Sequence, residues 1–292
     1  MANELATFSN ELAAIVEGAA RSVVAVHARP RFASSGVVWR PGVVVTAQHT
    51  IRREEEIVVT LPDGTNASAT LAGSDAGTDL AVLRVETAAP ALARAEGSAK
   101  AGNLAMAIGR SENSGPNATM GIVSAVSGPW RTWRGGRLDQ YIRLDLTLYP
   151  GSSGGAVVNV DGQAIGIATS ALSRIAGLAI PASTIDRVVD EILARGHVAR
   201  GYLGLGLQPV ALPDHQKGLL AVTVEPDGPA AKAGVLIGDI LLKLGGQAVT
   251  ETEDLQAALE THRVGTSVVA ELSRGGAPLA IEVVVGERPR RG

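Results

Sequence analysis

Short apolar segments separated by turn residues dominate the chain between about residues 23 and 179. The segments are four to six residues long and rich in Val, Ile and Ala, and Gly, Pro, Asn or Asp lies between many of them. Such segments predict short strands, and many short strands in succession predict a barrel or a sandwich. The predicted strands are 22–27, 36–39, 42–46, 57–61, 81–85, 104–108, 121–126, 141–145, 156–160 and 164–168.

Two segments carry the apolar period of a helix instead. Apolar residues recur at helical spacing over residues 12–19, and Ser9 or Asn10 is the candidate N-cap before them. Residues 182–195 form a second amphipathic stretch, and Gly196 suits the end of a helix there. We therefore expect an N-terminal helix and a second helix that follows the strand-rich region.

The remainder of the chain is interpreted as a separate small domain. It holds further strands and two short helical pieces, 230–233 and 252–260, and we place its boundary near Arg200. The expected organisation is an N-terminal helical segment at 1–22, a strand-rich domain at 23–199, a second domain at 200–288 and a tail at 289–292.

The bulk composition fits two globular domains and excludes several classes of site. The 292 residues are 46% hydrophobic and 19% charged, whereas aromatic residues make up only 3%, so Val, Ile, Leu and Ala must build the cores. The chain has no Cys, which rules out disulfides and Cys-based metal sites. A net charge of −3 gives no electrostatic reason to expect nucleic-acid binding.

The apolar segments also bear on membrane association and location. None approaches the roughly 20 residues of a membrane helix. The first residues lack the basic start and the continuous apolar stretch of a signal peptide. The sequence therefore predicts no membrane span and leaves the compartment unknown, with a cytoplasmic location open.

A glycine-rich loop with a central serine is the most informative motif. Residues 151–155 read Gly-Ser-Ser-Gly-Gly, a G-x-S-G-G pattern in which glycines let a substrate carbonyl approach the backbone. His49 and Asp79 precede Ser153 in the order of a chymotrypsin-type triad. We predict Ser153 as the nucleophile, His49 as its base and Asp79 as the acid that orients the imidazole. The N–H groups of Gly151 and Ser153 would form the oxyanion hole.

Neighbouring residues are rivals for two of these roles. Asp75, four positions before Asp79, is the rival acid, and Ser152 is the rival nucleophile. The glycine pair after Ser153 favours that serine, because it places the sharp turn there. His27 lies at the end of an apolar strand and is expected to be structural rather than a second base.

Six motifs, in order along the chain, resemble the high-temperature-requirement (HtrA/Deg) serine proteases. They lie at 35–38, 46–49, 75–83, 121–125, 177–181 and 200–204. His49 and Asp79 are 30 residues apart, and Asp79 and Ser153 are 74 apart, which is similar to the spacing in that family. The resemblance implies a mainly β fold, with a chymotrypsin-like double Greek-key β-barrel protease domain followed by a small α+β PDZ domain.

The same resemblance implies an activity and its partners. The protein would be an ATP-independent serine endopeptidase that cleaves unfolded or misfolded proteins in quality control and stress response. Unfolded proteins and C-terminal peptides would be its partners, with no cofactor, metal or nucleic acid, and it would form a homotrimer in the periplasm. The PDZ carboxylate loop would be formed by Tyr202, Leu203, Gly204 and Leu205.

The specificity pocket implied by the resemblance carries no charge. Its residues would be Thr147, Leu148, Ile167, Ala168, Thr169 and Leu178. Because a charged floor would select Lys or Arg, we expect cleavage next to small or medium aliphatic residues.

Several segments depart from the family pattern or have regulatory counterparts in it. Ser152 replaces the usual Asn, and Ala156 replaces the usual Pro, around the nucleophile. An alternative stays open, a proteolytically silent PDZ-containing chaperone that binds peptides, because Ser152, Leu146 and Tyr149 would disfavour a formed oxyanion hole. Residues 127–139 fall where the family has a sensor loop, and residues 29–34 form a short link where some relatives carry a long loop.

Overall fold

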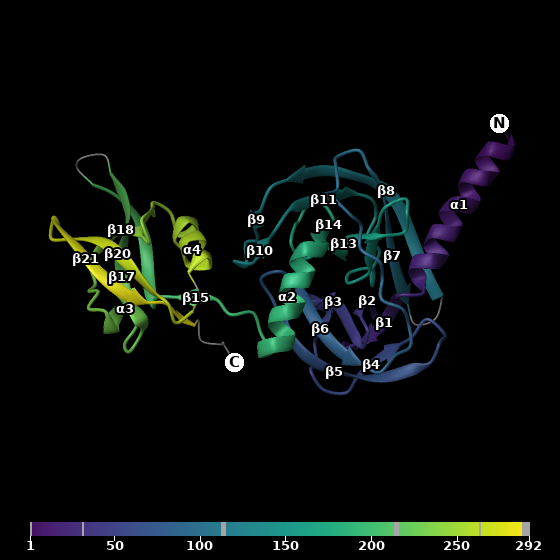
Figure 1. Ribbon diagram of the computed structural model, residues 1–292, viewed down its shortest axis with the longest axis horizontal. Helices are drawn as coiled ribbons and strands as arrows, with labels where there is room; N and C mark the ends of the chain where they lie inside the picture. Colours follow the sequence, from purple (N-terminus) through teal and green to yellow (C-terminus); the bar gives the residue numbers. More distant parts are fainter. Residues whose placement is uncertain (1, 31, 112–114, 213–215, 263, 288–292) are drawn as a thin grey trace. The chain divides into compact units, whose positions relative to one another are not determined.

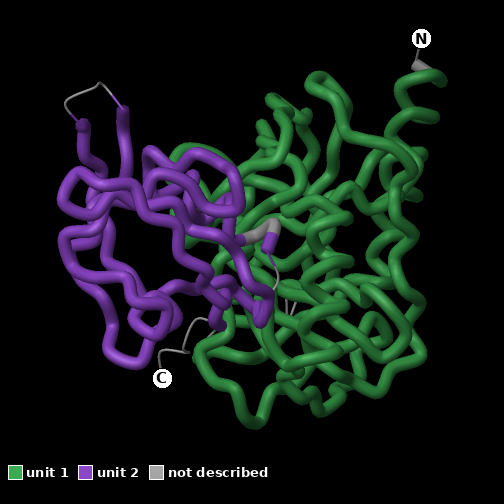
Figure 2. The backbone as a smooth tube through the Cα atoms, turned by 60° about the vertical axis from the view of Figure 1, so that its left-hand side comes forward, with its two compact units in different colours: residues 1–198 green, residues 199–292 purple. Residues whose placement is uncertain are grey.

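The computed structural model describes residues 2–30, 32–111, 115–212, 216–262 and 264–287. The chain divides into two compact units, Met1–Val198 and Ala199–Gly292, each with its own core (Figure 2). The first unit holds helix α1 (Ala2–Ala20), two closed barrels and helix α2 (Ala182–Arg195) (Figure 1). The expected tail at 289–292 lies outside the described residues.

The first barrel is a closed antiparallel sheet in the order β1-β2-β3-β6-β5-β4. Its strands are β1 (Val23–His27), β2 (Ser34–Arg40), β3 (Val43–Ala47), β4 (Ile57–Thr60), β5 (Asn66–Asp75) and β6 (Leu80–Val85). Val and Ile dominate β1, β3 and β4, and branched side chains pack well on a pleated surface. Val24, Val44 and Leu83 are among the residues that form the buried cluster of this barrel.

The second barrel closes in the order β11-β14-β13-β12-β7-β8. Its strands are β7 (Leu104–Ser111), β8 (Gly115–Ser127), β11 (Tyr141–Asp145), β12 (Ala156–Val158), β13 (Ala164–Thr169) and β14 (Leu178–Pro181). A short hairpin, β9 (Trp130–Arg131) and β10 (Arg137–Leu138), lies between β8 and β11 along the chain.

The largest core cluster contains residues of both barrels and of α2. Trp39 of the first barrel, Ile167 of the second and Ile185 of α2 all belong to it, and each is fully buried. Burying such a side chain contributes about 1.5–3 kcal/mol, so this shared core holds the two barrels in a fixed relation. The site therefore forms on a rigid scaffold.

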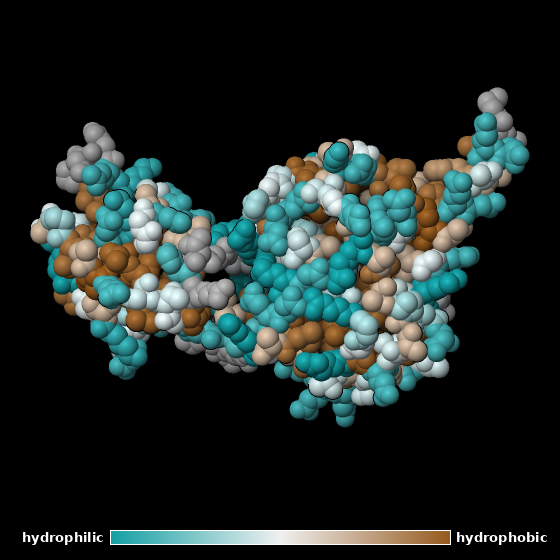
Figure 3. Space-filling model, viewed as in Figure 1, coloured by the Kyte–Doolittle hydropathy of each residue, from teal (hydrophilic) through white to brown (hydrophobic). Residues whose placement is uncertain are grey.

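Helix α2 confirms the sequence prediction at both ends. It begins at Ala182 and is followed by Gly196, whose φ of 79° is the left-handed conformation that glycine adopts easily. Its outward face is hydrophilic (Figure 3). Asp186 of α2 is half-buried and accepts hydrogen bonds from Trp39 Nε1 at 2.9 Å and from Arg94 at 2.7 Å.

Helix α1 begins at Ala2, so the predicted N-cap at Ser9 or Asn10 is wrong. The preceding residues are mostly good helix formers, and Glu4 lies in the first turn, where a negative charge favours the helix dipole. Ser9 and Asn10 are exposed within the helix, where their weaker helix propensity costs only a fraction of a kcal/mol, below about 0.7 per residue.

The sequence pattern did not predict strand β5. Its ten residues are mostly small or polar, and only two of them are buried. Strand β5 nevertheless pairs with β4 on one side and β6 on the other, so it closes the first barrel. The two neighbours supply ladder partners that the strand's own composition does not reveal.

The second unit is a small α+β fold built around a five-stranded path, β16-β17-β18-β20-β21. These strands are β16 (Leu205–Ala211), β17 (Lys217–Val224), β18 (Ile240–Leu244), β20 (Ser267–Arg274) and β21 (Ala277–Val284). The smaller elements are β15 (Gly201–Tyr202), α3 (Pro229–Lys232), β19 (Gln247–Ala248), α4 (Thr252–Thr261) and β22 (Gly286–Glu287). Of the helices in the described ranges of both units, none has the length and apolar character needed to cross a membrane.

Candidate active site

The His49 imidazole and the Asp79 carboxylate form a hydrogen-bonded pair at one end of the first barrel. His49 lies in a short turn of 3-10 helix (Gln48–Thr50) directly after β3, and Asp79 directly precedes β6. Ala47 of β3 pairs with Leu80 of β6, so the residues just beyond these strand ends lie together. Nδ1 of His49 is 2.9 Å from Oδ2 and 3.0 Å from Oδ1 of Asp79.

The Asp79 carboxylate is fully buried and held by further donors. The backbone N–H of His49 donates to Oδ1 at 2.9 Å, and Thr169 Oγ1 donates to Oδ2 at 2.5 Å. With a carboxylate facing it, Nδ1 of His49 carries a proton, which leaves Nε2 as the proton acceptor. An imidazole held in this way can act as a general base.

The rival acid, Asp75, has a different position and a different task. Its carboxylate accepts hydrogen bonds from the N–H of Gly77 at 3.3 Å, from the N–H of Thr78 at 3.0 Å and from Thr78 Oγ1 at 2.8 Å. These contacts shape the turn that leads into Asp79. The carboxylate that meets the His49 ring is that of Asp79.

Close packing requires glycine on the C-terminal side of Ser153. Gly154 has a φ of 87°, and a Cβ there would lie 2.1 Å from the carbonyl oxygen of Ser35 in the first barrel. A Cβ on Gly155 would lie 2.4 Å from the carbonyl oxygen of Ile108 in the second barrel. The glycine pair therefore lets the Ser153 loop sit between the two barrels.

Two consecutive hydroxyl residues at the end of β13 contact both Asp79 and the Ser153 loop. Thr169 donates to Asp79, and Ser170 Oγ lies 3.1 Å from Ser153 Oγ. These contacts bring the serine loop and the His49–Asp79 pair into one site. Among the hydrogen bonds of the described residues, Ser153 Oγ pairs with Ser170 and has none to His49.

The backbone around Gly151 leaves two N–H groups facing no protein acceptor. Gly151 has a φ of 93°, and its carbonyl oxygen accepts a hydrogen bond from Ser35 Oγ at 2.8 Å. The N–H of Ser152 donates to the carbonyl oxygen of Tyr149 at 2.9 Å. Within the part of the chain that the structure describes, the N–H groups of Gly151 and Ser153 donate to no acceptor, so both are available to a substrate oxygen.

The residues predicted for the specificity pocket lie in different environments. Ile167 and Leu178 are fully buried in the core shared by the barrels, and Ala168 is buried inside the second barrel. Thr147 is exposed and Leu148 is half-buried. Thr169 is also fully buried. The pocket stays a prediction, and of its six residues Thr147 and Leu148 have accessible surface.

In the second unit, the predicted carboxylate loop is held by its carbonyl groups. The carbonyl oxygen of Leu203 accepts from the N–H of Ala230, and that of Gly204 accepts from the N–H of Glu225, both at 2.8 Å. Gly204 has a φ of 77°, and the Tyr202 hydroxyl donates to the Glu225 carboxylate. Among the described residues the N–H groups of Leu203 and Gly204 have no acceptor, as a carboxylate-binding loop requires.

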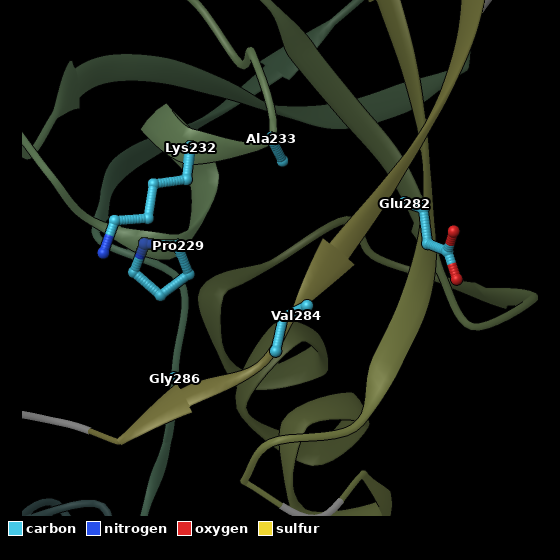
Figure 4. A pocket seen from close by; sticks show the side chains of 6 residues that line it. All are labelled: Pro229, Lys232, Ala233, Glu282, Val284 and Gly286. Atoms are coloured by element: carbon cyan, nitrogen blue, oxygen red, sulfur yellow. The ribbon is translucent and has the colours of Figure 1, made fainter.

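The second unit also contains a pocket that is lined by none of the predicted carboxylate-loop residues. It lies between α3 and the strands β21 and β22 (Figure 4), and its lining consists of Pro229, Lys232, Ala233, Glu282, Val284 and Gly286. The Lys232 ammonium and the Glu282 carboxylate lie on its opposite sides (Figure 4). Across the described ranges of the chain, no group of His, Cys, Asp and Glu side chains is arranged to hold a metal ion.

Sequence reasoning missed the roles of Ser35 and Ser170. Ser35 Oγ donates to the carbonyl oxygen of Gly151 and accepts from the N–H of Arg110, so it ties the serine loop to strand β7. These partners are 116 and 75 positions away from Ser35 in the sequence. The Ser-Gly start of β2 marked Ser35 as part of a motif, but no spacing rule indicates which backbone groups a hydroxyl will meet.

Two domain families match the chain. Residues 34–167 match the trypsin-like peptidase domain, and residues 201–285 match the PDZ domain. The serine endoprotease DegS of Haemophilus influenzae is 32% identical over 265 residues, which are 87% of this chain and 77% of DegS. The probable periplasmic serine endoprotease DegP-like of Brucella suis is 32% identical over 280 residues, 90% of this chain and 54% of that protein. The chain thus spans about half the length of its DegP-like relatives.

Solved structures agree with these matches over almost the whole chain. The serine endoprotease from Yersinia pestis superposes with a TM-score of 0.79 at 32% identity, covering 94% of this chain and 97% of that one. The HtrA-type protease AlgW with decapeptide gives a TM-score of 0.80 at 29% identity, covering 95% and 98%. Together with the two barrels and the α+β unit, these matches show that the chain belongs to the HtrA/Deg family of serine endoproteases, which combine a trypsin-like peptidase domain with a PDZ domain.

Proposed function

We propose that this protein is a serine endopeptidase that cleaves unfolded or misfolded proteins without ATP. One observation carries the proposal: the His49 imidazole is paired with the buried Asp79 carboxylate, and Thr169 and Ser170 link that carboxylate to the Ser153 hydroxyl. The membership of the family and the glycine-rich serine loop support the same reading.

In the proposed reaction, Ser153 Oγ attacks the carbonyl carbon of the scissile peptide bond while His49 Nε2 takes the hydroxyl proton. Asp79 stabilises the imidazolium that forms and keeps its orientation. The imidazolium then donates the proton to the leaving amine, and an acyl ester on Ser153 remains. Water, activated by His49, hydrolyses this ester and restores the hydroxyl.

The N–H groups of Gly151 and Ser153 are the proposed oxyanion donors. Both lack a protein acceptor among the described residues, and each such donor is typically worth about 3–4 kcal/mol of transition-state stabilisation. To reach the reactive geometry, the Ser153 hydroxyl leaves Ser170 and turns to His49. Cleavage next to small or medium aliphatic residues is part of the proposal, because the predicted pocket residues Thr147 and Leu148 are uncharged.

We also propose that the second unit binds C-terminal peptides and regulates cleavage. The two N–H groups of Leu203 and Gly204 would hold the terminal carboxylate, and the peptide would continue as a strand beside β16. The test is to measure the cleavage rate with an added peptide. We expect the rate to change when the peptide has a free C-terminus, and to stay the same when its C-terminus is an amide.

We also propose that the protein forms a homotrimer, and the exposed apolar side chains of helix α1 support this. Leu12 and Ile15 pack against the core shared by the barrels, whereas Leu5 and Phe8 continue the same stripe and are 72% and 46% exposed. Neighbouring copies would cover this apolar surface. Light scattering of the wild type and of Phe8→Asp tests this, with a smaller particle expected for the variant. The name of the DegP-like relatives makes the periplasm the proposed location.

Casein cleavage by the wild type and by Ser153→Ala tests the proposed activity. We expect the wild type to produce fragments and the variant to produce none. The alternative, a proteolytically silent chaperone, predicts that neither protein cleaves casein while both still suppress aggregation of an unfolded client. That outcome would refute the proposed endopeptidase.

A further inference from the structure

The β9–β10 hairpin contacts the turn that precedes Asp79. At the hairpin turn, Thr132 Oγ1 donates a hydrogen bond to the carbonyl oxygen of Gly77 at 2.7 Å. Thr132 is only 4% exposed, so this is an interior contact rather than a surface one. The two segments are 55 residues apart in the sequence, and the contact joins the region of the second barrel to a loop of the first.

Gly136 brings the hairpin backbone directly against the same turn. A Cβ on Gly136 would lie 2.1 Å from the carbonyl carbon of Gly77, 2.3 Å from its oxygen and 2.6 Å from the nitrogen of Thr78. All three atoms belong to the backbone, so a side chain here could be accommodated only if the turn moved. The N–H of Gly136 also donates to Thr132 Oγ1 at 3.1 Å, which fixes the direction of that hydroxyl.

The turn that receives these contacts leads into a residue with unusual backbone geometry. Asp79 has a φ of 59°, in the left-handed region that non-glycine residues rarely adopt. Such a conformation persists when the surrounding structure holds it on both sides. Strand β6 holds the chain after Asp79, and the Asp75 carboxylate holds Gly77 and Thr78 before it.

The other end of the hairpin is anchored to helix α2. Leu138 is fully buried in the shared core, and the N–H of Asp139 donates a hydrogen bond to Thr184 Oγ1 at 2.8 Å. Arg187 of α2 donates to the carbonyl oxygen of Arg137 at 2.9 Å. The hairpin therefore connects a rigid helix to the Gly77–Thr78 backbone.

We infer that Thr132 and Gly136 are positioning residues for Asp79. The hydrogen bond from Thr132 and the close packing of Gly136 fix the Gly77–Thr78 backbone, so that the Asp79 carboxylate stays aligned with the His49 ring. The inference rests on the proposed endopeptidase. A displacement of the acid misaligns the imidazole without touching the substrate, and a displacement near 1 Å in a catalytic group can lower the rate by about a hundredfold.

The hydroxyl is tested by Thr132→Val and Thr132→Ser in the full chain. We expect kcat for an aliphatic peptide substrate to fall by about 10- to 100-fold in Thr132→Val with KM nearly unchanged, and to recover in Thr132→Ser. Proton NMR supplies a readout that needs no activity. The downfield Nδ1–H resonance of His49, assigned by its loss in His49→Ala, should shift or broaden in Thr132→Val and return in Thr132→Ser.

The close backbone approach is tested by Gly136→Ala against Gly128→Ala. Gly128 lies just before β9 and has no atom within 4 Å of an added Cβ, so it is the matched control. In Gly136→Ala we expect kcat to fall and the His49 Nδ1–H resonance to shift or broaden. In Gly128→Ala we expect neither to change. Wild-type kcat and an unchanged resonance in Thr132→Val and Gly136→Ala would overturn the inference.

Circular dichroism separates positioning from folding. If both Thr132→Val and Gly136→Ala fail to fold, the contact serves the stability of the fold and the inference is likewise overturned. A wild type that cleaves nothing refutes the proposed activity instead, and the NMR comparison still decides whether the hairpin sets the His49–Asp79 geometry.

Discussion

Replacing Ser170 with alanine is expected to make the Ser153 hydroxyl more reactive. Ser153 Oγ pairs with Ser170 Oγ at 3.1 Å, and either hydroxyl can be the donor. When Ser153 donates, its proton must leave Ser170 before His49 can take it. A neutral hydrogen bond of this kind contributes about 0.5–1.5 kcal/mol, which corresponds to about a twofold to tenfold change in an equilibrium. Ser170 is exposed, so its truncation should cost little stability. We therefore expect Ser170→Ala to react with a fluorophosphonate about two to ten times faster than the wild type.

The assay is the second-order rate constant of labelling, measured over a range of reagent concentrations. Ser98→Ala removes another exposed hydroxyl and should label at the wild-type rate. Ser153→Ala should not label at all. A Ser170→Ala protein that labels at the wild-type rate or more slowly would refute the reasoning, because Ser170 would then not hold the nucleophile away from His49.

Three further predictions concern the serine loop, the pocket and the second unit. Gly154→Ala would place a Cβ 2.1 Å from the carbonyl oxygen of Ser35, so we expect lost casein cleavage and a lower melting temperature; an active, wild-type-like variant would contradict the packing argument. Thr147→Asp should shift peptide-library cleavage toward Lys or Arg, and an unchanged aliphatic preference would remove Thr147 from the pocket. Hydrogen bonds from Arg274 hold the pKa of Asp239 below its usual range, against the opposing effect of burial, and the N–H of Leu236 helps. A lowered folded pKa stabilises the fold above the unfolded value of about 3.9, and this contribution is lost as the pH falls through the folded pKa. Urea unfolding should therefore show wild type more stable than Asp239→Asn at neutral pH, with the difference shrinking in acid.

Much of the architecture was accessible from the order of residues. Short Val-rich segments bounded by turns indicated a barrel or a sandwich, and the motifs in order indicated the family, which the matches to the trypsin-like peptidase and PDZ domains confirm. The stripe over 182–195 with Gly196 after it also predicted α2 correctly. These features are local, because strand and helix periodicity and a left-handed glycine are properties of neighbouring residues.

Other features had no local signal. Strand β5 is mostly small and polar, and it exists because β4 and β6 pair with it on both sides. Helix α1 extends to Ala2, past residues that would suit a cap, because nothing in the exposed helix forces it to end there. Propensity is worth a few tenths of a kcal/mol per residue and does not outweigh such context.

The sequence by itself determined which residue types stand in the triad order and where glycine is required beside Ser153. Only the tertiary structure decided that Asp79 rather than Asp75 meets His49, that Ser153 rests against Ser170, and that a hairpin 55 residues away bonds to the turn before Asp79. The physical reason is the short range of these contacts. Hydroxyls and carboxylates act over about 3 Å, and which of them come within that distance depends on how two barrels pack, which no window of neighbouring residues encodes.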